Sequence, residues 1–430
     1  LIIVVNDNDM SIAENHGGLY QNLKLLRETD GKADCNLFRA MGLDYIYVNE
    51  GNNTAALIEA FQKAKDTDHA VVVHINTLKG KGYAPAEQHK EQWHYNAPFD
   101  LKTGMPLYPA DGEDYSSVTR DYLLKKMKED PTVVAITSGT PTVMEFTEDK
   151  RKEAGRQFVD VGIAEEHAVS FAAGLALGGV VPVVAIYSSF LQRAVDQMLH
   201  DVCMQKLHVI FAVDRAGLVG ADGETHQGVF DLSYLTEMPN MTVMAPKNKW
   251  ELSDMLKFAI RQKSPVAIRY PRGEAYTGLE DYRAPIEMGK AEILEKGKEI
   301  AILAVGNMVR TAVQVTENLR NCGYEPTLVN MRFVKPLDMD LLEILREDHS
   351  LIVTMEENVK SGGFGEQVMT YYGSRLHSPA VRIVAIEDKF VPHGSVEDLM
   401  HQQQMDSASV TERILRWKEE QQKSTEQLPE

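Results

Sequence analysis

The sequence predicts an α/β protein with three successive α/β domains and mainly parallel sheets, and three observations support this fold class. Apolar runs of strand length alternate with stretches of helical period along the whole chain, a pattern that is typical of βα units. Two stretches rich in glycine and proline interrupt this pattern. The length of 430 residues corresponds to about three domains of ordinary size.

The predicted strands are short runs rich in Val, Ile and Ala. The first run, residues 1–5, is continuously apolar and is expected to form a buried parallel strand. Because such a strand seldom begins a chain, we expect a further segment before it. The remaining strands are expected at residues 70–75, 133–137, 181–187, 208–214, 241–245, 267–270, 299–305 and 350–355.

The predicted helices lie between these strands. The helical period predicts them at residues 54–65, 166–176, 249–261 and 311–321. The most apolar stretch, residues 171–187, is interrupted by three glycines and a proline. It therefore predicts a buried helix, a turn and a strand in place of a transmembrane helix.

Two linkers are predicted where glycine, proline and polar residues accumulate without a clear period. They divide the chain into three blocks. We expect domains at residues 1–100, 115–275 and 289–430, with linkers at residues 101–114 and 276–288.

The charge balance excludes some classes of partner. The chain has 45 basic and 63 acidic residues, a formal net charge of −18, so neither nucleic acid nor an anionic membrane surface is an expected partner. Cys35, Cys203 and Cys322 are far apart and predict no disulfide framework, which favours a cytoplasmic location. The sequence contains no dinucleotide fingerprint, P-loop, nucleophile elbow or Cys/His zinc cluster.

Two loops directly follow predicted strands of the first block. Residues 6–10 read Asn-Asp-Asn-Asp-Met, and ligands of open α/β sheets bind beyond the carboxyl ends of strands. Oxygen-rich side chains there suit Mg²⁺ shared with a substrate phosphate; the alternative is an Asx turn without a ligand. Residues 80–85 read Gly-Lys-Gly-Tyr-Ala-Pro, which allows close approach of a ligand to the backbone or forms an ordinary loop.

Two acids, Glu165 and Glu166, begin an apolar helix rich in small residues. Negative charge is favourable at a helix N-terminus, which explains an acid on the surface. It explains less well an acid with apolar sequence on both sides, because burial removes the hydration of its charged form. A capping acid and a functional carboxyl group are therefore both open at this point.

Charged side chains also follow three predicted strands of the second block. An arginine recognises a phosphate or carboxylate through two parallel hydrogen bonds, and a histidine among arginines transfers protons near neutral pH. Each arginine alone is better explained by a surface ion pair. Their shared position at one side of one sheet favours an anion site made of Arg193, Arg215, Asp222, His226 and Arg272.

Six motifs together resemble the 1-deoxy-D-xylulose-5-phosphate synthase family, thiamine-diphosphate-dependent enzymes of the transketolase superfamily. The resemblance runs from residue 1 to about residue 415. It rests on Asn-Asp-Asn-Asp-Met-Ser-Ile, Gly-Lys-Gly-Tyr-Ala-Pro-Ala-Glu, Gly-Ile-Ala-Glu-Glu-His-Ala, Ile-Tyr-Ser-Ser-Phe-Leu-Gln-Arg-Ala, Asp-Arg-Ala-Gly and Asp-Gly-Glu-Thr-His-Gln-Gly. The last two motifs are specific to the synthase within the superfamily.

The resemblance implies a transketolase-like fold whose domains bind the cofactor diphosphate, bind the aminopyrimidine and form the transketolase C-terminal domain. It implies a cytoplasmic homodimer that uses thiamine diphosphate and Mg²⁺. The implied reaction condenses pyruvate with D-glyceraldehyde 3-phosphate through a cofactor-bound enamine, releases CO₂ and begins the non-mevalonate isoprenoid pathway. The product also supplies thiamine biosynthesis.

The resemblance also assigns roles around the cofactor. Glu165 matches the glutamate that hydrogen-bonds the aminopyrimidine ring, and Glu166 stands where the family usually has Gln. Asn8 and the backbone carbonyl of Met10 match metal ligands. The implied cofactor contacts are Asn8, Met10, Tyr83, Glu165 and Phe190, with Phe190 stacked on the aminopyrimidine.

Further roles concern the reacting carbon and the substrate. His94 and His226 match histidines near the reacting carbon, where they carry protons or orient groups. The matched substrate pocket consists of Tyr187, Arg193, Arg215, Asp222 and Arg272, with the arginines on the phosphate of glyceraldehyde 3-phosphate.

The sequence departs from the family pattern at its start. The family's Gly-Asp-Gly element, which carries an aspartate metal ligand, is not in this sequence. We therefore expect a preceding N-terminal segment, either on a longer form of this chain or on a separate chain, and weak cofactor binding by this chain alone. Two alternatives to the synthase remain: another thiamine-diphosphate ketol transferase, such as a transketolase, and a non-catalytic chain that completes a partner polypeptide.

Overall fold

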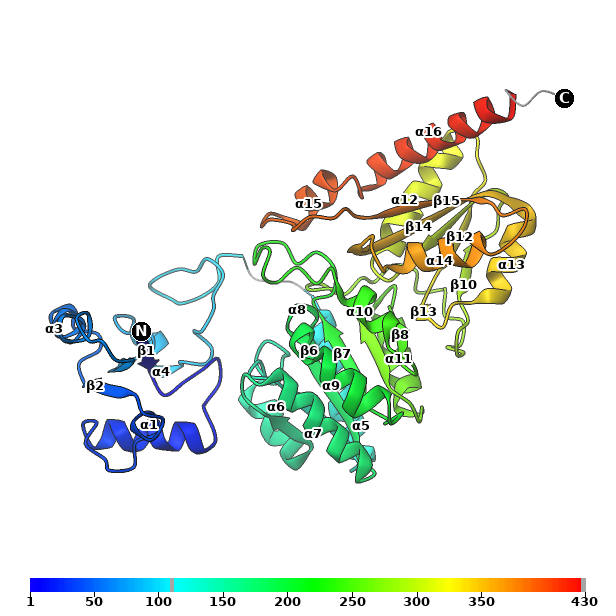
Figure 1. Cartoon of the computed structure of the whole chain (residues 1–430). Helices are drawn as coiled ribbons and strands as arrows, with labels where there is room; N and C mark the ends of the chain where they lie inside the picture. Colours follow the sequence, from blue (N-terminus) through cyan, green and yellow to red (C-terminus); the bar gives the residue numbers. More distant parts are fainter. Residues whose placement is uncertain (109–111, 427–430) are drawn as a thin grey trace. The chain divides into compact units, whose positions relative to one another are not determined.

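The computed structural model describes residues 1–108 and 112–426, and they form two compact units (Figure 1). The first unit contains the residues before the gap together with Ser138–Val143 and Asp160–Ala164. The second contains Gly112–Thr137, Met144–Val159 and the chain from Glu165 onward. In the described part of the chain, no helix combines the length and apolarity that a membrane crossing requires.

The first unit is a parallel three-stranded sheet between helices. The strand order is β1 (Ile2–Asp7), β3 (Val71–Asn76), β2 (Asp44–Val48). Successive residues of β3 face opposite sides: Val72 packs with α1 (Gly18–Glu28) and α2 (Leu37–Ala40), whereas Val71 and Val73 pack with α3 (Thr54–Ala64). The sheet is thus covered on both faces at its central strand.

The prediction of a buried first strand is wrong. Strand β1 is an edge strand that pairs only with β3 among the described residues. Ile3 and Val5 pack toward the α1 side, but Ile2 and Val4 are 39% and 48% exposed. The physical reason is that α3 covers the central strand and leaves this face of β1 open.

The second unit contains a seven-stranded sheet in the order β13-β8-β9-β7-β6-β4-β5. Strands β4, β6, β7, β9 and β8 are parallel, so their carboxyl ends lie at one edge. The strands are β4 (Val133–Thr137), β5 (Phe158–Asp160), β6 (Val181–Tyr187), β7 (Ile210–Asp214), β8 (Thr242–Met244), β9 (Val266–Arg269) and the antiparallel β13 (Phe333–Lys335).

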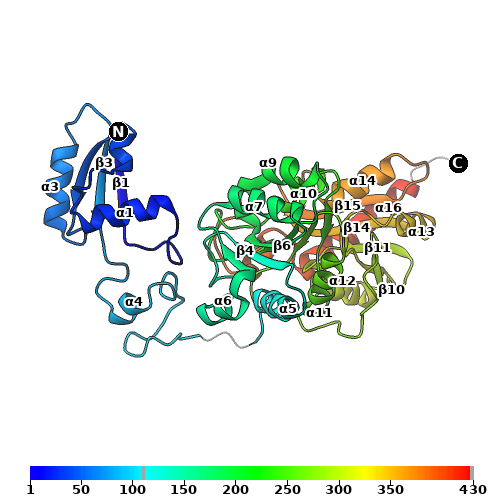
Figure 2. The same cartoon turned by 90° about the horizontal axis from the view of Figure 1, so that it is seen from below.

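Helices flank this sheet, and α5 and α11 lie side by side (Figure 2). Asp114 caps α5 in a reciprocal capping box with Ser117. Helix α7 follows β5 and leads through a glycine turn into β6. The helices of this part are α5 (Tyr115–Glu129), α6 (Glu148–Ala154), α7 (Glu165–Leu177), α8 (Ser188–Leu191), α9 (Val195–Gln197), α10 (Asp231–Glu237) and α11 (Lys249–Ile260).

The second unit also contains a five-stranded sheet in the order β10-β12-β11-β14-β15. Its core is a continuous apolar cluster between the sheet, α12 and α16. The strands are β10 (Glu292–Glu295), β11 (Glu299–Ala304), β12 (Thr327–Asn330), β14 (His349–Val359) and β15 (Ala380–Ile386). The helices are α12 (Met308–Asn321), α13 (Met339–Asp348), α14 (Phe364–Gly373), α15 (Val396–Gln402) and α16 (Ser407–Glu426).

The predicted α/β class with mainly parallel sheets is confirmed. Every predicted strand and helix is present, most of them with ends shifted by one to three residues. The larger deviation is β14, which was predicted to end at residue 355 and runs to Val359. Its extension contains the buried polar residues Glu356, Glu357 and Asn358, whose partners lie elsewhere in the chain.

Candidate functional site

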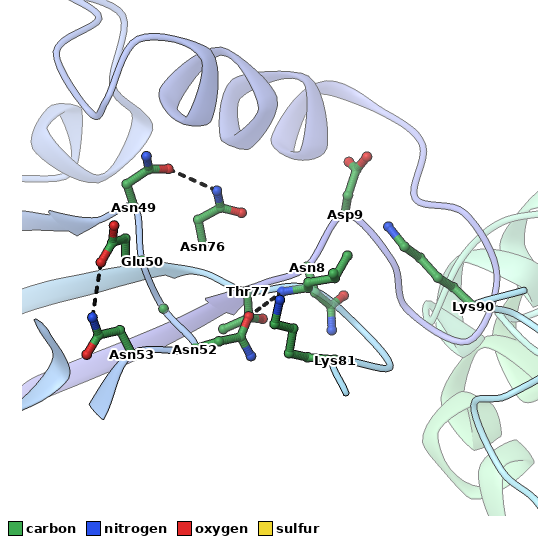
Figure 3. A pocket seen from close by; sticks show the side chains of 12 residues that line it. Asn8, Asp9, Asn49, Glu50, Asn52, Asn53, Asn76, Thr77, Lys81 and Lys90 are labelled. Carbon is green, nitrogen blue, oxygen red and sulfur yellow. Dashed lines mark hydrogen bonds between the residues drawn. The ribbon is translucent and has the colours of Figure 1, made fainter. Parts of the chain in front are cut away.

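The first unit has a polar hollow of about 520 Å³ at the carboxyl ends of its strands (Figure 3). Asn8 follows β1, Asn49 follows β2 and Thr77 follows β3, and all three line the hollow. Lys81 and Lys90 line it as well. Neither lysine forms an ion pair within the described ranges. The hollow is also lined by two acids, Glu50 and the Arg27-paired Asp9.

The loop after β1 is held by side-chain turns. The backbone N–H of Met10 donates to Asn8 Oδ1 at 3.1 Å, and that of Asp9 donates to Asp7 Oδ1 at 3.2 Å. The loop after β1 therefore contains two Asx turns. A carbonyl oxygen has two lone pairs, so Asn8 Oδ1 retains acceptor capacity toward the hollow.

The donor set of this loop suits part of a magnesium site. Asn8 supplies an amide oxygen and Met10 a backbone carbonyl, and both are the hard ligands that Mg²⁺ prefers. The described residues contain no cluster of three or more His, Cys, Asp or Glu side chains that would hold a metal by itself. The loop therefore fits an ion that takes its other ligands from phosphate oxygens, water or further protein groups.

A buried polar network supports this loop, and the sequence reasoning missed it. Arg27 Nη1 lies 2.6 Å from both carboxylate oxygens of Asp7, and His74 Nε2 lies 2.8 Å from Asp7 Oδ2. The other ring nitrogen of His74 lies 2.6 Å from the Tyr45 hydroxyl. Burial raises the pKa of Asp7, but the hydrogen bonds from His74 and Arg27 outweigh it and lower the pKa to about 2.

Tyr83 and His94 also lie in the first unit. Tyr83 precedes α4 (Ala84–Gln88), its ring packs against Trp93 and Phe99 at centroid distances of 5.0 and 5.7 Å, and its buried hydroxyl has no hydrogen-bond partner in the described structure. His94 is exposed. Partial desolvation and the nearby Lys79 charge lower its pKa.

The backbone geometry at position 80 explains why a glycine is needed there. Its φ of +83° is in the left-handed region, and a Cβ there would lie 2.6 Å from the carbonyl carbon of Ala86. The ordinary-loop explanation therefore accounts for this glycine, while the adjacent Lys81 faces the hollow.

In the second unit, Glu165 is the buried member of the acidic pair. It begins α7 and is 3% exposed, whereas Glu166 is exposed. Arg193 Nη1 lies 3.5 Å from Glu165 Oε1. Of the two acids, the buried one is therefore the residue to which the family resemblance assigns the cofactor contact.

Three predicted site residues meet beyond the end of β6. The Phe190 ring packs against Tyr187 at 5.0 Å and meets His226 edge-on at 5.4 Å, measured between ring centroids. The Tyr187 hydroxyl is buried without a partner in the described structure, and burial raises its pKa well above the ordinary value. Thr225 Oγ1 lies 2.8 Å from His226 Nδ1. The rings of Tyr187, Phe190 and His226 therefore form one cluster at the carboxyl end of β6.

Two of the three predicted arginines share one acid. Asp222 Oδ2 lies 3.2 Å from Arg215 Nη1 and 2.7 Å from Arg272 Nη1. The Arg215 guanidinium also lies 4.2 Å from the centre of the Tyr187 ring. Arg193 does not join this group and pairs with Glu165. The arginine–aspartate group thus carries a net charge of +1.

A tight loop pairing holds this group in place. Gly217 and Gly228 exchange backbone hydrogen bonds of 2.6 and 2.8 Å. A Cβ on Gly228 would lie 2.1 Å from the Arg215 carbonyl oxygen, so only glycine fits. This pairing brings residues of the Asp-Arg-Ala-Gly motif beside those of the Asp-Gly-Glu-Thr-His-Gln-Gly motif.

Asp214 is a buried residue of this edge that the sequence reasoning left without a role. It ends β7, and its carboxylate accepts hydrogen bonds from Ser116 Oγ at 2.7 Å and from the Arg215 N–H at 2.6 Å. Burial raises its pKa to about 6. A strand-terminal aspartate directly before a predicted site arginine was the available signal.

Comparison with known proteins gives the family. Residues 112–277 match the family described as transketolase, pyrimidine binding domain, and residues 289–410 match the transketolase C-terminal domain. The 1-deoxy-D-xylulose-5-phosphate synthase of Lachnoclostridium phytofermentans is 44% identical over 97% of this chain and 72% of its own length. That of Clostridium tetani is 40% identical over 97% of this chain and 73% of its own length.

Solved structures show the same fold. A chain of a split-gene transketolase, which was solved as an inactive tetramer of its beta chain, superposes with a TM-score of 0.64. The identity is 26%, over 71% of this chain and 98% of that chain. Transketolase from Campylobacter jejuni superposes with a TM-score of 0.60 and 15% identity over 96% of this chain and 72% of that chain. The two synthases are at least 40% identical to this chain over 97% of its length. The chain therefore belongs to the 1-deoxy-D-xylulose-5-phosphate synthase family of thiamine-diphosphate-dependent transferases.

Proposed function

We propose that this protein condenses pyruvate with D-glyceraldehyde 3-phosphate, releasing CO₂ and forming 1-deoxy-D-xylulose 5-phosphate for isoprenoid biosynthesis. One observation carries the proposal. A buried glutamate, an aromatic–imidazole cluster and two arginines on one aspartate all follow strands of the same seven-stranded sheet. Residues 115–275 then serve as the pyrimidine-binding domain, residues 289–430 as the C-terminal domain and residues 1–100 as part of the diphosphate-binding domain.

Thiamine diphosphate supplies the electron sink for this chemistry when it is bound. In our proposal, Asn8 Oδ1 and the Met10 carbonyl bind Mg²⁺, and Tyr83 contacts the cofactor. The two free lysines of the polar hollow, Lys81 and Lys90, support this assignment because they complement a diphosphate. Mg²⁺ binds through few protein oxygens when phosphate and water complete its shell.

Glu165 binds a ring nitrogen of the aminopyrimidine in this proposal, and Phe190 stacks on the ring. The burial of Glu165 supports the assignment, because a carboxyl group withdrawn from water is a directed hydrogen-bond partner. His94 and His226 hold or move protons near the reacting carbon, and the aromatic surroundings of His226 orient its ring.

Substrate binding is assigned to Tyr187, Arg193 and the arginine–aspartate group. Arg215 and Arg272 both contact one carboxylate oxygen, so their guanidinium groups already converge. A substrate phosphate carries more charge than a carboxylate and accepts several charge-assisted hydrogen bonds. The convergence supports binding of the phosphate of glyceraldehyde 3-phosphate.

We further propose that the protein works in the cytoplasm as a homodimer and that a complementary polypeptide segment supplies another metal ligand. The three cysteines are free, which agrees with a reducing compartment. The similarity to a split-gene transketolase chain supports the complementary segment.

The test is product formation from pyruvate and D-glyceraldehyde 3-phosphate in the active preparation, with every co-purifying polypeptide retained. Glu165→Ala removes the buried carboxyl group, and we expect it to lower the rate by at least about 100-fold. The matched control is Glu166→Ala, which removes the exposed neighbour and leaves the rate nearly unchanged. Equal rates for the two variants contradict the assignment. Preference for a sugar phosphate acceptor with release of no CO₂ indicates a transketolase activity.

A further inference from the structure

A basic groove lies between two helices of the second unit, outside the proposed active site. It is a hollow of about 280 Å³ lined by α5 residues Tyr122, Lys125, Lys126 and Glu129, and by Lys257, Ile260 and Arg261 at the end of α11. We call it the α5–α11 groove. Figure 2 shows the two helices next to each other. Four of its seven lining residues are cationic, in a chain whose net charge is −18.

Most of these cations make no ion pair within the described part of the chain. Lys126 pairs with Glu129 at 3.6 Å and with Asp130 at 4.0 Å. Lys125, Lys257 and Arg261 are exposed and make no ion pair with any residue that the structure describes. Three positive charges around one small hollow repel one another, and an anion between them removes that repulsion.

The helix dipoles explain only part of this charge. The groove lies toward the C-terminal ends of both α5 and α11. Each helix C-terminus carries roughly half a negative charge, so two ends offset about one cation. About two positive charges then remain without a structural reason.

The floor of the groove is less polar than its rim. Tyr122 and Ile260 are half-buried, and burial raises the pKa of Tyr122 to about 12. Its hydroxyl group therefore stays protonated near neutral pH and is available as a hydrogen-bond donor to a ligand. An anionic group at the rim and a small apolar part on the floor match this arrangement.

The position of the groove separates it from the proposed reaction. Helix α5 leads into β4 and α11 leads into β9, so the groove lies beside the amino ends of these parallel strands. Tyr187 and Arg215 lie at and beyond the carboxyl ends of β6 and β7. The groove is thus at the opposite edge of the sheet from the arginine–aspartate group.

We propose that the α5–α11 groove binds a small phosphorylated molecule with at least two negative charges. Its volume of about 280 Å³ matches a small molecule better than a macromolecule. The Arg261 fork and two lysine point charges complement phosphate oxygens, and Tyr122 and Ile260 contact the remainder of the ligand. A free phosphorylated metabolite is the intended occupant, not a lipid headgroup.

Calorimetric titration with inorganic diphosphate tests the proposal. To remove the proposed substrate site, the titration uses a protein carrying Arg215→Ala and Arg272→Ala as its background. We expect saturable binding that Lys257→Ala with Arg261→Ala weakens by about tenfold or more, since two charge-assisted contacts are lost. Because the cofactor hollow of the first unit is unchanged, any binding there stays the same in all variants.

The matched control is Lys263→Ala, which removes an exposed positive charge just beyond Arg261 without touching the groove. It should bind diphosphate like the background protein. If Lys263→Ala weakened diphosphate binding as much as the double variant does, the loss would come from the change in net charge alone, and the proposal would be overturned. Binding to vesicles of phosphatidylinositol phosphate without binding of free diphosphate would overturn it as well, and so would unchanged binding in the double variant.

Discussion

His74 Nε2 lies 2.8 Å from Asp7 Oδ2, although the two residues are 67 positions apart in the sequence. The contact joins the central strand of the first unit to the last residue of its edge strand. Since Asp7 directly precedes Asn8, this buried pair sets where the proposed metal loop begins. The loop geometry therefore depends on the sheet interior as well as on its own turns.

Loss of the imidazole should destabilise the first unit. His74→Ala leaves the Tyr45 hydroxyl without its partner and removes one of the two contacts of Asp7 Oδ2, which keeps only Arg27. Leaving buried polar groups unpaired costs about 1–3 kcal/mol in the free energy of unfolding. Urea unfolding, monitored by hydrogen exchange of β1 and β3, measures the change in the free energy of unfolding. His69→Ala, which removes an exposed histidine paired with Asp44 at 3.5 Å, is the control and should change little.

Asp214 should make stability depend on pH. Burial raises its pKa from 3.8 to about 6, so the folded protein holds this proton more tightly than the unfolded chain. The contribution of this group is then fully present below about pH 4 and is lost as the pH rises through 6. The full loss is on the order of 3 kcal/mol, from about 1.4 kcal/mol per pKa unit.

Asp214→Asn removes this titration, so the free energy of unfolding of the variant should fall less between pH 4 and pH 7 than that of the unchanged protein. Urea unfolding at several pH values measures the difference. Asp149→Asn changes an exposed aspartate and should retain the original pH dependence. Parallel curves for Asp214→Asn and the unchanged protein would contradict the prediction.

The arginine–aspartate group should act on the phosphate of the acceptor. Arg272→Ala removes one of the two guanidinium groups that converge on Asp222. We expect kcat/KM for D-glyceraldehyde 3-phosphate to fall by about 10- to 100-fold, since a hydrogen bond to a charged group is worth roughly 1.5–3 kcal/mol. With D-glyceraldehyde, which lacks the phosphate, kcat/KM should stay nearly constant. An equal fall for both aldehydes would point to a disrupted fold.

A buried ion cluster should hold the two sheets of the second unit together. Arg332 Nη2 lies 2.7 Å from both Glu251 and Glu292, and Lys247 Nζ lies 2.7 Å from Glu292. Arg332→Ala leaves excess negative charge in an interior position, which costs about 3–5 kcal/mol. The midpoint of urea unfolding should fall accordingly.

Arg283→Ala is the matched control for this cluster. Its side chain is 47% exposed and pairs with Asp254 at 2.8 Å, and exposed pairs contribute about 1 kcal/mol or less. A similar loss of stability in both variants would show that burial of the cluster is unimportant.

Local signals predicted much of the fold. Strand β6 was predicted with its observed ends because residues 181–187 are apolar apart from Pro182 and follow a glycine-containing turn. The extension of β14 was not predictable from its own residues. Glu356 accepts hydrogen bonds from the Phe364 and Gly365 N–H groups, and Glu357 from the Leu218 N–H group, and only the tertiary fold brings these donors to the strand.

The same distinction applies to the candidate site. Position after a strand was enough to predict that Arg215, Asp222 and Arg272 share one edge. Which arginine pairs with which acid was not predictable, and Arg193 pairs with Glu165 instead. The Arg27–Asp7–His74 network was missed because its members come from separate elements, each with an ordinary local pattern.

Strand β13 has a consequence for dividing this protein into pieces. Phe333–Lys335 comes from the last third of the chain and pairs with β8 at the border of the seven-stranded sheet. A fragment truncated between the two matched transketolase regions would lose that pairing and expose the backbone of β8 as an open edge. Open edges recruit strands from other molecules. Expression of the pyrimidine-binding region alone should therefore give aggregates, and co-expression with the remaining C-terminal part should restore a monodisperse product.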